Sequence, residues 1–286
     1  MTVLICMSNI FIGTSGWVYP DWQGKFYPSN LIQKKWLEVY AQNFQTVEIN
    51  STFYHSMRPT TFEKWAKAVP SNFIFAVKAS RFITHIKRLK DPREPLSRFM
   101  EAVLSLDKKL GPALFQMPPR FKADEERLES FLSTVHGLQS TVVGRRKKTA
   151  TQLHSRSVHG SSEAHSGSEI RLAFEFRDLS WFNESIYKIL KKYNAALVIT
   201  ESGGYWPSSE VVTADFTYLR FHGEGGSYAS KYTDGELNDW VAKIKKWQKA
   251  GIGVYAYFNN DVAAFAIENA KTLISLLYQQ VALSQF

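Results

Sequence analysis

The chain has 286 residues, of which 44% are hydrophobic, and this is enough to bury one sizeable core. Its single cysteine, Cys6, excludes an internal disulfide framework and a metal centre built from several cysteines, which favours a reducing compartment. The net charge of +9 favours acidic partners, while no run of about 18 apolar residues predicts a membrane span. Residues 1–9 lack a basic leader followed by a long apolar stretch. We therefore expect a soluble, cytoplasmic protein without membrane association.

Short apolar runs rich in Phe, Val, Ile and Tyr recur along the chain, and most of them end in polar residues. Runs of this length and composition predict buried strands. In chain order the predicted strands are 10–14, 46–50, 73–78, 113–116, 172–177, 195–200, 216–222 and 253–259.

Most of the segments between these runs carry apolar residues at three- and four-residue spacing, which is typical of amphipathic helices. Asp124 suits a helix cap, and Pro95 suits a first helical turn. Only the short segment 208–215 precedes the seventh strand, so we expect no normal helix there. The predicted helices are 34–43, 60–69, 95–109, 124–136, 183–193, 235–250 and 262–277.

This alternation of strand and helix predicts the α/β class and, within it, a (β/α)8 TIM-type barrel that is irregular around the sixth βα unit. The chain slightly exceeds the roughly 250 residues typical of such barrels, so we expect a single domain over 1–286. The excess length is accounted for by a low-complexity basic insertion at about 137–170, rich in Ser, His and Gly and without apolar periodicity. We interpret it as a solvated loop, with a nucleic-acid-binding arm as the alternative.

The ends of the predicted strands carry polar and charged residues. Successive side chains of a strand point to opposite faces, so Glu175 and Arg177 share one face while Phe174 and Phe176 share the other. Barrels of this kind carry their chemistry at the carboxyl ends of the strands, so we expect one polar pocket at the barrel mouth. Its predicted members are Glu48, Asn50, Lys78, Gln116, Glu175, Arg177, Arg220, His222 and Asn259.

The loops that follow the strands extend this predicted pocket with aromatic residues and glycines. The seventh loop of such barrels often binds phosphate through backbone amides, and here it begins at Gly223. Because Arg220 and Lys78 lie on the same rim, an anionic ligand is favoured. Trp181 and Trp206 also fall in loops at this end. The further predicted substrate-binding residues are Trp17, Tyr19, Tyr54, His85, Trp181, Gly223 and Asp261.

A purely structural interpretation of the charged rim stays open. Glu175 with Arg177 or Arg220 could form a buried ion pair that closes the top of the core, and aromatic side chains at a barrel mouth often only pack loops. No dense ligand set predicts a metal centre and no cofactor is predicted, although a single divalent metal is not excluded.

Several motifs in the chain resemble the YecE-like family, also called domain of unknown function 72. The resemblance covers about 10–136 and 170–277, and it implies a variant (β/α)8 barrel without supplying a reaction. The insertion departs from the short connection usual in that family. The motifs are GTSGWVYPDW at 13–22, VEINSTFY at 47–54, the segment from Lys78 to His85, LFQMPPRF at 114–121, AFEFRDLSW at 173–181, YLRFHG at 218–223 and YAYFNND at 255–261.

Two classes of function follow from these residues. The first is an enzyme, a hydrolase or an isomerase, acting on a small polar anionic substrate that resembles a sugar or a phosphate. In it Glu48 and Glu175 serve as acid and base, and His222 carries a proton. Lys78, Arg177 and Arg220 would then hold the negative charge. The second is a nucleic-acid-binding or phosphodiester-processing protein, in which Trp17, Tyr19, Trp22 and Tyr54 stack bases above a basic rim. The sequence favours the first class and leaves the oligomeric state undetermined.

Overall fold

Eight parallel strands form a nearly closed barrel in the computed structural model, which describes residues 9–154 and 169–283. The hydrogen-bonded order is β1-β8-β7-β6-β5-β4-β3-β2, so the first and second strands lie at the two ends of one curled sheet. The strands are β1 Ile10–Thr14, β2 Thr46–Ile49, β3 Ile74–Lys78, β4 Leu110–Gln116, β5 Leu172–Glu175, β6 Ala195–Glu201, β7 Phe216–Phe221 and β8 Gly253–Phe258.

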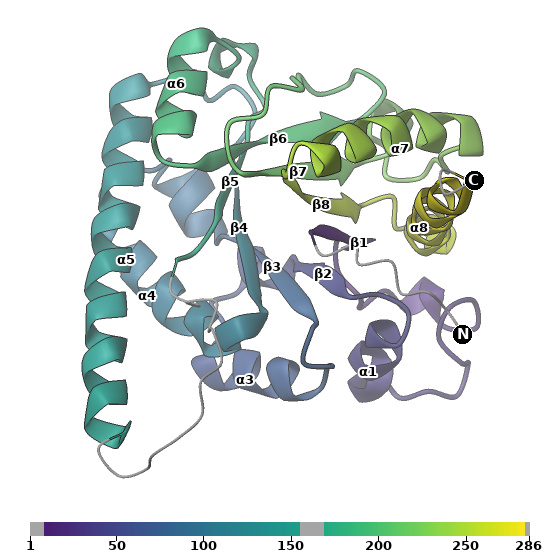
Figure 1. Ribbon diagram of the computed structural model, residues 1–286, viewed down its shortest axis with the longest axis horizontal. Coiled ribbons are helices and arrows are strands. Elements are labelled where there is room, and N and C mark those ends of the chain that lie inside the picture. Colours follow the sequence, from purple (N-terminus) through teal and green to yellow (C-terminus); the bar gives the residue numbers. More distant parts are fainter. Residues whose placement is uncertain (1–8, 155–168, 284–286) are drawn as a thin grey trace.

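Helices surround this barrel, with α5 along one side and α7 and α8 on the opposite side (Figure 1). Within the described ranges, none of the helices has both the length and the apolar character that a membrane crossing requires. The α-helices are α1 Trp36–Ala41, α2 Ser51–Tyr54, α3 Pro59–Lys67, α4 Arg93–Val103, α5 Glu125–His154, α6 Glu184–Lys192, α7 Asp234–Lys249 and α8 Phe265–Leu283. The shorter helices are η1 Pro20–Trp22, η2 Gln33–Lys35, the π-helix η3 Phe82–Ile86, η4 Leu104–Lys109, η5 Leu179–Trp181, η6 Glu224–Gly226 and η7 Val262–Ala264.

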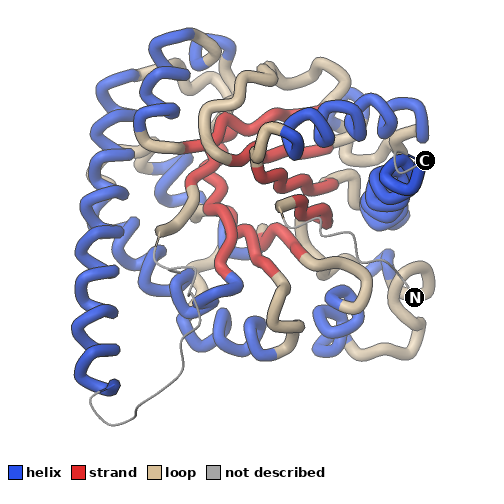
Figure 2. The backbone as a smooth tube through the Cα atoms, viewed as in Figure 1, coloured by secondary structure: helices blue, strands red, loops and turns tan. Residues whose placement is uncertain are grey.

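The predicted barrel is confirmed, including its irregular sixth unit. Residues 202–215 connect β6 to β7 without a helix (Figure 2). This connection is tied to β6 through Thr213, whose hydroxyl accepts from the Leu197 N–H at 2.8 Å and donates to the Ala195 carbonyl at 2.6 Å. The prediction that Asp124 caps its helix is also confirmed, because its side chain accepts from the Arg127 N–H at 3.0 Å.

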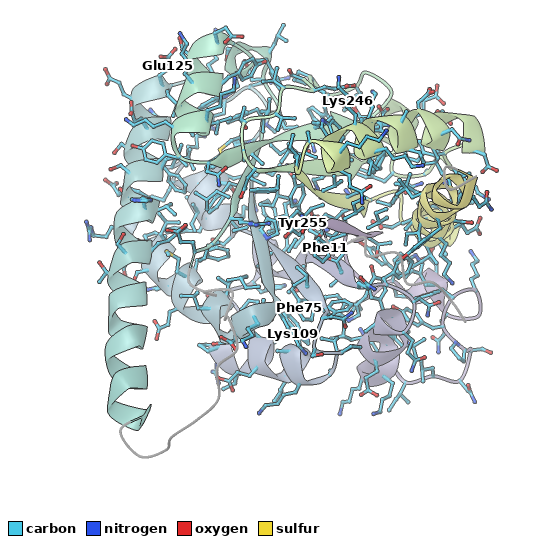
Figure 3. All side chains as sticks on the ribbon, viewed as in Figure 1. Phe11, Phe75, Lys109, Glu125, Lys246 and Tyr255 are labelled. Carbon is cyan, nitrogen blue, oxygen red and sulfur yellow. The ribbon has the colours of Figure 1, made fainter. Side chains whose placement is uncertain are left out.

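The alternation of side chains along the strands produces two separate cores. The outer core lies between strands and helices, where the rings of Phe115 and Phe174 stack with centroids 5.3 Å apart. The inner core fills the barrel, and its lower layer contains the stacked rings of Phe11 and Tyr255, 4.9 Å apart (Figure 3). Small side chains on β3 to β6 face aromatic ones on β7 and β8, as packing inside a small barrel requires. The inner core consists of Ala76, Leu114, Ala173, Ala196, Val198, Phe216, Tyr218, Tyr255 and Tyr257.

The seam between β1 and β2 is closed by a side chain. Among the described residues no backbone ladder joins these two strands. Instead the buried Tyr40 hydroxyl accepts from the Thr14 N–H at 2.9 Å and donates to the Thr46 carbonyl at 3.0 Å. The approach is so close that a Cβ atom on Gly13 would lie 2.2 Å from the Thr46 oxygen, so only glycine fits there.

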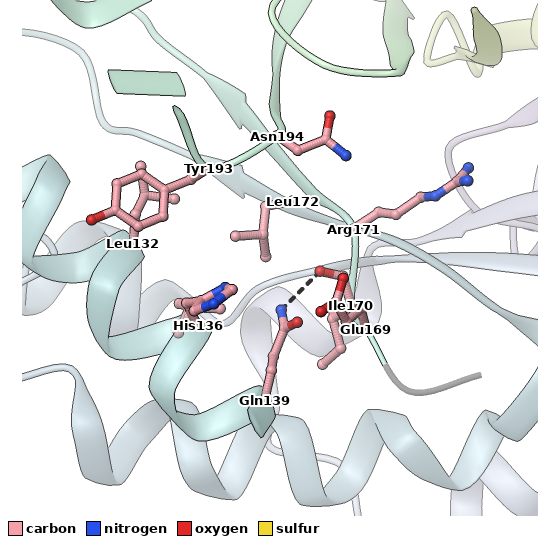
Figure 4. A pocket seen from close by; sticks show the side chains of 10 residues that line it. Leu132, His136, Gln139, Glu169, Ile170, Arg171, Leu172, Tyr193 and Asn194 are labelled. Carbon is pink, nitrogen blue, oxygen red and sulfur yellow. Dashed lines mark hydrogen bonds between the residues drawn. The ribbon is translucent and has the colours of Figure 1, made fainter. Parts of the chain in front are cut away.

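The predicted end of the fourth helix at His136 was wrong, because α5 continues to His154. Gln139 is buried within this extension and donates to the Ile170 carbonyl at 2.9 Å (Figure 4). Residues 137–154 contain no proline and several good helix formers, so their lack of apolar periodicity did not exclude a helix. The remainder of the predicted insertion, at 155–168, lies outside the described residues.

We expect Tyr40→Phe to lower the free energy of unfolding by about 1–3 kcal/mol, because the buried Thr14 N–H and Thr46 carbonyl lose their shared partner. Urea unfolding measures this loss. Tyr187→Phe is the matched control, since it removes a hydroxyl on α6 for which no hydrogen bond is present in the described structure. Equal losses in the two variants would contradict the assignment of Tyr40 as the closure of the seam.

Candidate functional site

The upper layer of the barrel interior is organised by Arg220 on β7. Its Nε and Nη2 atoms donate to both oxygens of Glu48 at 3.1 and 2.8 Å, and its Nη1 donates to Glu175 Oε2 at 2.8 Å. The three side chains are essentially inaccessible to solvent, with 1% exposure for Arg220. Burial alone would raise the pKa of Glu175, but Arg177 and Arg220 beside it hold that pKa well below its usual range. Arg220 is therefore a buried ion-pair bridge with its donors occupied.

The strand pattern explains why Arg220 can reach both carboxylates. Tyr218 and Arg220 are two residues apart on β7 and point into the barrel, where the Tyr218 hydroxyl donates to Glu48 Oε2 at 2.6 Å. β7 and β2 are not neighbours in the sheet, so the arginine spans the interior. The small side chains of Ala76 and Ala173 on intervening strands leave room for it.

Arg177, just after β5, is held on one side only. Its Nη2 donates to Glu175 Oε1 and lies 3.1 Å from His222 Nε2. Its guanidinium lies over the Trp206 ring, 4.3 Å from the centroid. Arg177 Nε and Nη1 and Trp206 Nε1 are buried and have no hydrogen-bond partner in the described structure. Unpaired buried donors are costly, and three of them around one stacked pair indicate a place where a ligand or water accepts hydrogen bonds.

This stacked pair forms part of the wall of an open cleft of about 870 Å³ on the carboxyl face. Besides Arg177, the cleft wall contains a second cation, the exposed Arg120. The cleft is lined by Pro119, Arg120, Arg177, Asp178, Leu179, Gly204, Tyr205, Trp206 and Pro207.

His222 is fully buried and neutral at neutral pH. Burial lowers its pKa to about 4, with Arg220 and Arg177 acting in the same direction against Glu175. Its Nδ1 lies 3.1 Å from the Asn259 amide nitrogen, and its Nε2 lies 3.1 Å from both Arg177 Nη2 and Glu175 Oε1. The amide and the guanidinium only donate and the carboxylate only accepts, so these contacts favour neither tautomer of His222. The role of His222 as proton carrier stays a prediction. Its contact with Glu175 indicates a second role, which is to orient this carboxylate.

A second polar cluster lies where the loops after β1, β2 and β8 meet. The Ser15 carbonyl accepts from the Tyr19 hydroxyl and from the Asn50 amide, the latter at 3.1 Å. Burial raises the pKa of Asp261 to about 7, with the nearby Tyr19 hydroxyl and Arg220 acting in the opposite direction. Ser15 Oγ, Asn50 Oδ1 and Asp261 Oδ1 are buried without a partner in the described structure.

Lys78 ends β3 on the same mouth. Its ammonium lies 4.4 Å from the centroid of the Phe53 ring, and no carboxylate lies within ion-pair distance of it in the described ranges. Burial lowers its pKa to about 7, and the neighbouring Arg220 adds to this effect. His85 packs edge-on against the same Phe53 ring, and its Nδ1 lies 2.8 Å from the Thr84 hydroxyl.

Some of the predicted aromatic contacts belong to the core. Trp17 is buried edge-on against Trp65, and Trp22 is fully buried, so neither offers a free face to a base or a sugar. The prediction that Trp181 contacts a substrate was wrong, because it is fully buried and stacked on Phe176 with centroids 4.4 Å apart. An alternation pattern cannot distinguish a loop tryptophan that turns inward from one that faces a cleft.

The glycine-rich loop after β7 uses its first amides within the protein. Gly223 adopts the left-handed conformation at φ 77°, and its N–H donates to the Tyr232 hydroxyl at 2.8 Å. The next amide, of Glu224, donates to the Ser230 hydroxyl. A phosphate bound by these two amides would have to displace both hydroxyls.

The remaining residues refine the membership of the site. Tyr54 is 71% exposed and Gln116 is only partly buried, and neither side chain donates or accepts a hydrogen bond in the described structure. The sequence interpretation missed three residues of the site, Tyr218, Ser15 and Thr200. The Thr200 hydroxyl donates to Glu175 Oε1 at 3.2 Å. Period-two spacing from Arg220 would have identified Tyr218.

No group of three or more His, Cys, Asp or Glu side chains in the described ranges is arranged to hold a metal ion. The residues that gather at the barrel mouth are two ion-paired carboxylates, two arginines, a neutral histidine, a lysine and a half-buried aspartate.

Known proteins resemble this chain over nearly its whole length. A family model described as "Protein of unknown function DUF72" matches residues 11–285. The UPF0759 protein YunF of Bacillus subtilis (strain 168) is 26% identical over 298 aligned residues, or 94% of each protein. The UPF0759 protein YecE of Escherichia coli (strain K12) is 28% identical over 129 residues, or 45% of each.

Solved structures agree with the fold. A DUF72 family protein from Thermotoga maritima aligns with a TM-score of 0.75 at 25% identity, covering 94% of this chain and 99% of that one. A DUF72 family protein from Enterococcus faecalis aligns with a TM-score of 0.70 at 21% identity, covering 94% and 95%.

We expect Arg220→Met to lower the free energy of unfolding by about 3–5 kcal/mol, because it leaves Glu48 buried without its cation and removes one of two cations from Glu175. Denaturant unfolding measures the loss. Arg98→Met is the matched control, since this arginine on α4 is 77% exposed, pairs only with the exposed Glu94 in the described structure, and should cost less than about 1 kcal/mol. Comparable small losses in both variants would show that the bridge does not stabilise the barrel.

Stability should also depend on pH through His222. Its pKa in the unfolded chain is near 6.5 and about 4 in the folded protein, so the unfolded state binds more protons between these values and stability falls as pH decreases from 6.5. His222→Gln should reduce the slope between pH 6.5 and 5 by roughly 1 kcal/mol per pH unit, whatever its effect on absolute stability. His85, whose pKa burial also lowers to about 4, contributes a separate share. An unchanged slope in His222→Gln would mean that His222 binds protons equally in the folded and unfolded states, and that burial does not lower its pKa.

Proposed function

The chain belongs to the DUF72 family, and we propose that it is an enzyme that acts on a small polar anionic substrate by acid–base chemistry at the barrel mouth. The observation that carries this proposal is the guanidinium of Arg177, which is 6% exposed yet leaves Nε and Nη1 unpaired beside the open cleft. A cation used only for structure would have these donors occupied, as Arg220 does.

The charge balance around Arg177 supports an anionic ligand. Glu48 and Glu175 neutralise Arg220 and Arg177 within the buried network. Arg120 on the cleft wall adds a positive charge, and Asp178 on the same wall offsets it. Lys78 adds positive charge at the mouth when it is protonated. An incoming phosphate or carboxylate would therefore accept hydrogen bonds from a guanidinium with free donors, beside a wall whose own charges cancel.

Two groups at this mouth support acid–base chemistry near neutral pH. Burial lowers the pKa of Lys78 and raises that of Asp261, and both reach about 7. A neutral amine can accept a proton and a protonated carboxyl can donate one. In this proposal they take the acid and base roles first expected of Glu48 and Glu175, because both glutamates are bound to Arg220.

The nucleic-acid alternative has weaker support. Of the four aromatic residues expected to stack bases, Trp17 and Trp22 are buried and Tyr19 is partly buried. Only Tyr54 presents an exposed ring.

We expect Arg177→Met to weaken the binding of inorganic phosphate by more than tenfold, which corresponds to roughly 1.5–3 kcal/mol for charge-assisted hydrogen bonds. Isothermal titration calorimetry at low ionic strength measures the affinity, with urea unfolding to confirm that the variant is folded. Arg171→Met, at the other end of β5, serves as the control and should bind as the original protein does. The proposal fails if phosphate does not bind the original protein, or if it binds Arg177→Met equally well.

A further inference from the structure

We propose that Lys78 forms an imine with its substrate, so that the substrate class is a small aldehyde or ketone that carries an anionic group. This inference rests on the proposed function, because the anionic group would bind at Arg177. It makes Lys78 a nucleophile in place of the base, leaves Asp261 as the acid–base group, and narrows the chemistry to bonds next to a carbonyl carbon.

The surroundings of Lys78 differ from those of most lysines whose contacts are described. Surface lysines such as Lys192 and Lys231 have a carboxylate partner. Lys109 donates to the carbonyl oxygens of Ala66 and Val69, at 2.5 and 2.7 Å. Lys78 has neither kind of partner in the described structure, and its amine lies over the Phe53 ring. Lys271 also lies over an aromatic ring without such a partner, but it is exposed on α8, whereas Lys78 is half-buried at the barrel mouth. An amine without hydrogen bonds keeps its lone pair available once it loses its proton.

The backbone around Lys78 is held in place. The Thr52 hydroxyl donates to the Lys78 carbonyl at 2.6 Å, and the next residue, Phe53, supplies the ring beneath the amine. Both come from α2, the short helix that follows β2. The Ala79 N–H donates to the Leu114 carbonyl at 2.8 Å, which extends the β3–β4 ladder past Lys78. The base of the side chain is therefore positioned by three neighbouring strands and their loops.

The charged groups around the amine favour its neutral form. Burial is the largest cause of the lowered pKa of about 7, and the cations Arg220 and Arg177 act in the same direction. The carboxylates of Glu48 and Glu175 oppose them. A substantial fraction of Lys78 is then an unprotonated amine near pH 7, which is the form that attacks a carbonyl carbon.

The covalent step balances without an external oxidant or reductant. The lone pair of Nζ forms a bond to the carbonyl carbon while the carbonyl oxygen takes up a proton, which produces a carbinolamine. The nitrogen then loses its remaining protons as the hydroxyl leaves as water, so that amine and carbonyl become imine and water. When the imine nitrogen takes up a proton from solvent, it withdraws electrons from the adjacent carbon, and a C–H or C–C bond next to that carbon becomes easier to break. Isomerisation and carbon–carbon cleavage are reactions of this kind.

Reductive trapping tests the inference. We would incubate the full chain at pH 7 with glyceraldehyde 3-phosphate or with uncharged glyceraldehyde, reduce with sodium borohydride, and locate the adduct by peptide mass spectrometry. The first adduct should fall on Lys78, should form at least tenfold more readily with the phosphorylated aldehyde, and should be suppressed by inorganic phosphate. Lys78→Met should lose this adduct, whereas Lys109→Met should keep it. The peptide map of the original protein decides the question even if Lys78→Met fails to fold.

The two proposals fail in different ways. If phosphate binds through Arg177 but the label avoids Lys78 or spreads over exposed lysines, the imine is overturned and the anion site stands. If both aldehydes label Lys78 equally and phosphate does not compete, the anion site is overturned while Lys78 keeps its role as a nucleophile.

Discussion

The mouth of this barrel depends on one buried cation that spans its interior. Arg220 leaves β7, reaches Glu48 on β2 and Glu175 on β5, and so ties together three strands that are not neighbours in the sheet. Such a bridge tolerates little displacement, because a shift of any of these strands would leave a charge buried without its partner. The other polar groups of the mouth are arranged around this rigid centre, which gives them fixed positions before any ligand arrives.

The two arginines of the mouth differ in how many of their hydrogen-bond donors are occupied. Arg220 has its donors bound to carboxylates, whereas Arg177 shares Glu175 through one nitrogen and rests on Trp206. The difference comes from position: Arg220 lies within a strand inside the barrel, and Arg177 follows the end of one, beside the cleft. The structural interpretation of the charged rim is thus realised in Arg220, while the unpaired donors of Arg177, in the same network, are what the proposed function rests on.

The sequence predicted the barrel and the convergence of Glu48, Glu175 and Arg220 because strand periodicity alone determines which side chains share a face. The sequence could not decide how Arg177 and Arg220 would share Glu175, since this depends on the exact distances between side chains across the barrel. Nor could the sequence predict that Trp181 turns into the core while Trp206 lines the cleft, because loops have no repeating pattern of side-chain directions. The length of α5 was missed for a related reason: without an apolar stripe, the sequence of a helix resembles that of a loop.

The side-chain closure at Tyr40 has a consequence for how the chain is assembled. β1 has its backbone ladder with β8, so that Ile10 pairs with Val254, near the opposite end of the described chain. During synthesis the apolar strand β1, IFIGT, therefore has no β8 to pair with until nearly the whole barrel has been made. The close approach at Gly13 and the Tyr40 hydroxyl join β1 to β2, which is made soon afterwards. A nascent chain can thus shelter its first strand against its second long before the last strand exists to complete the sheet.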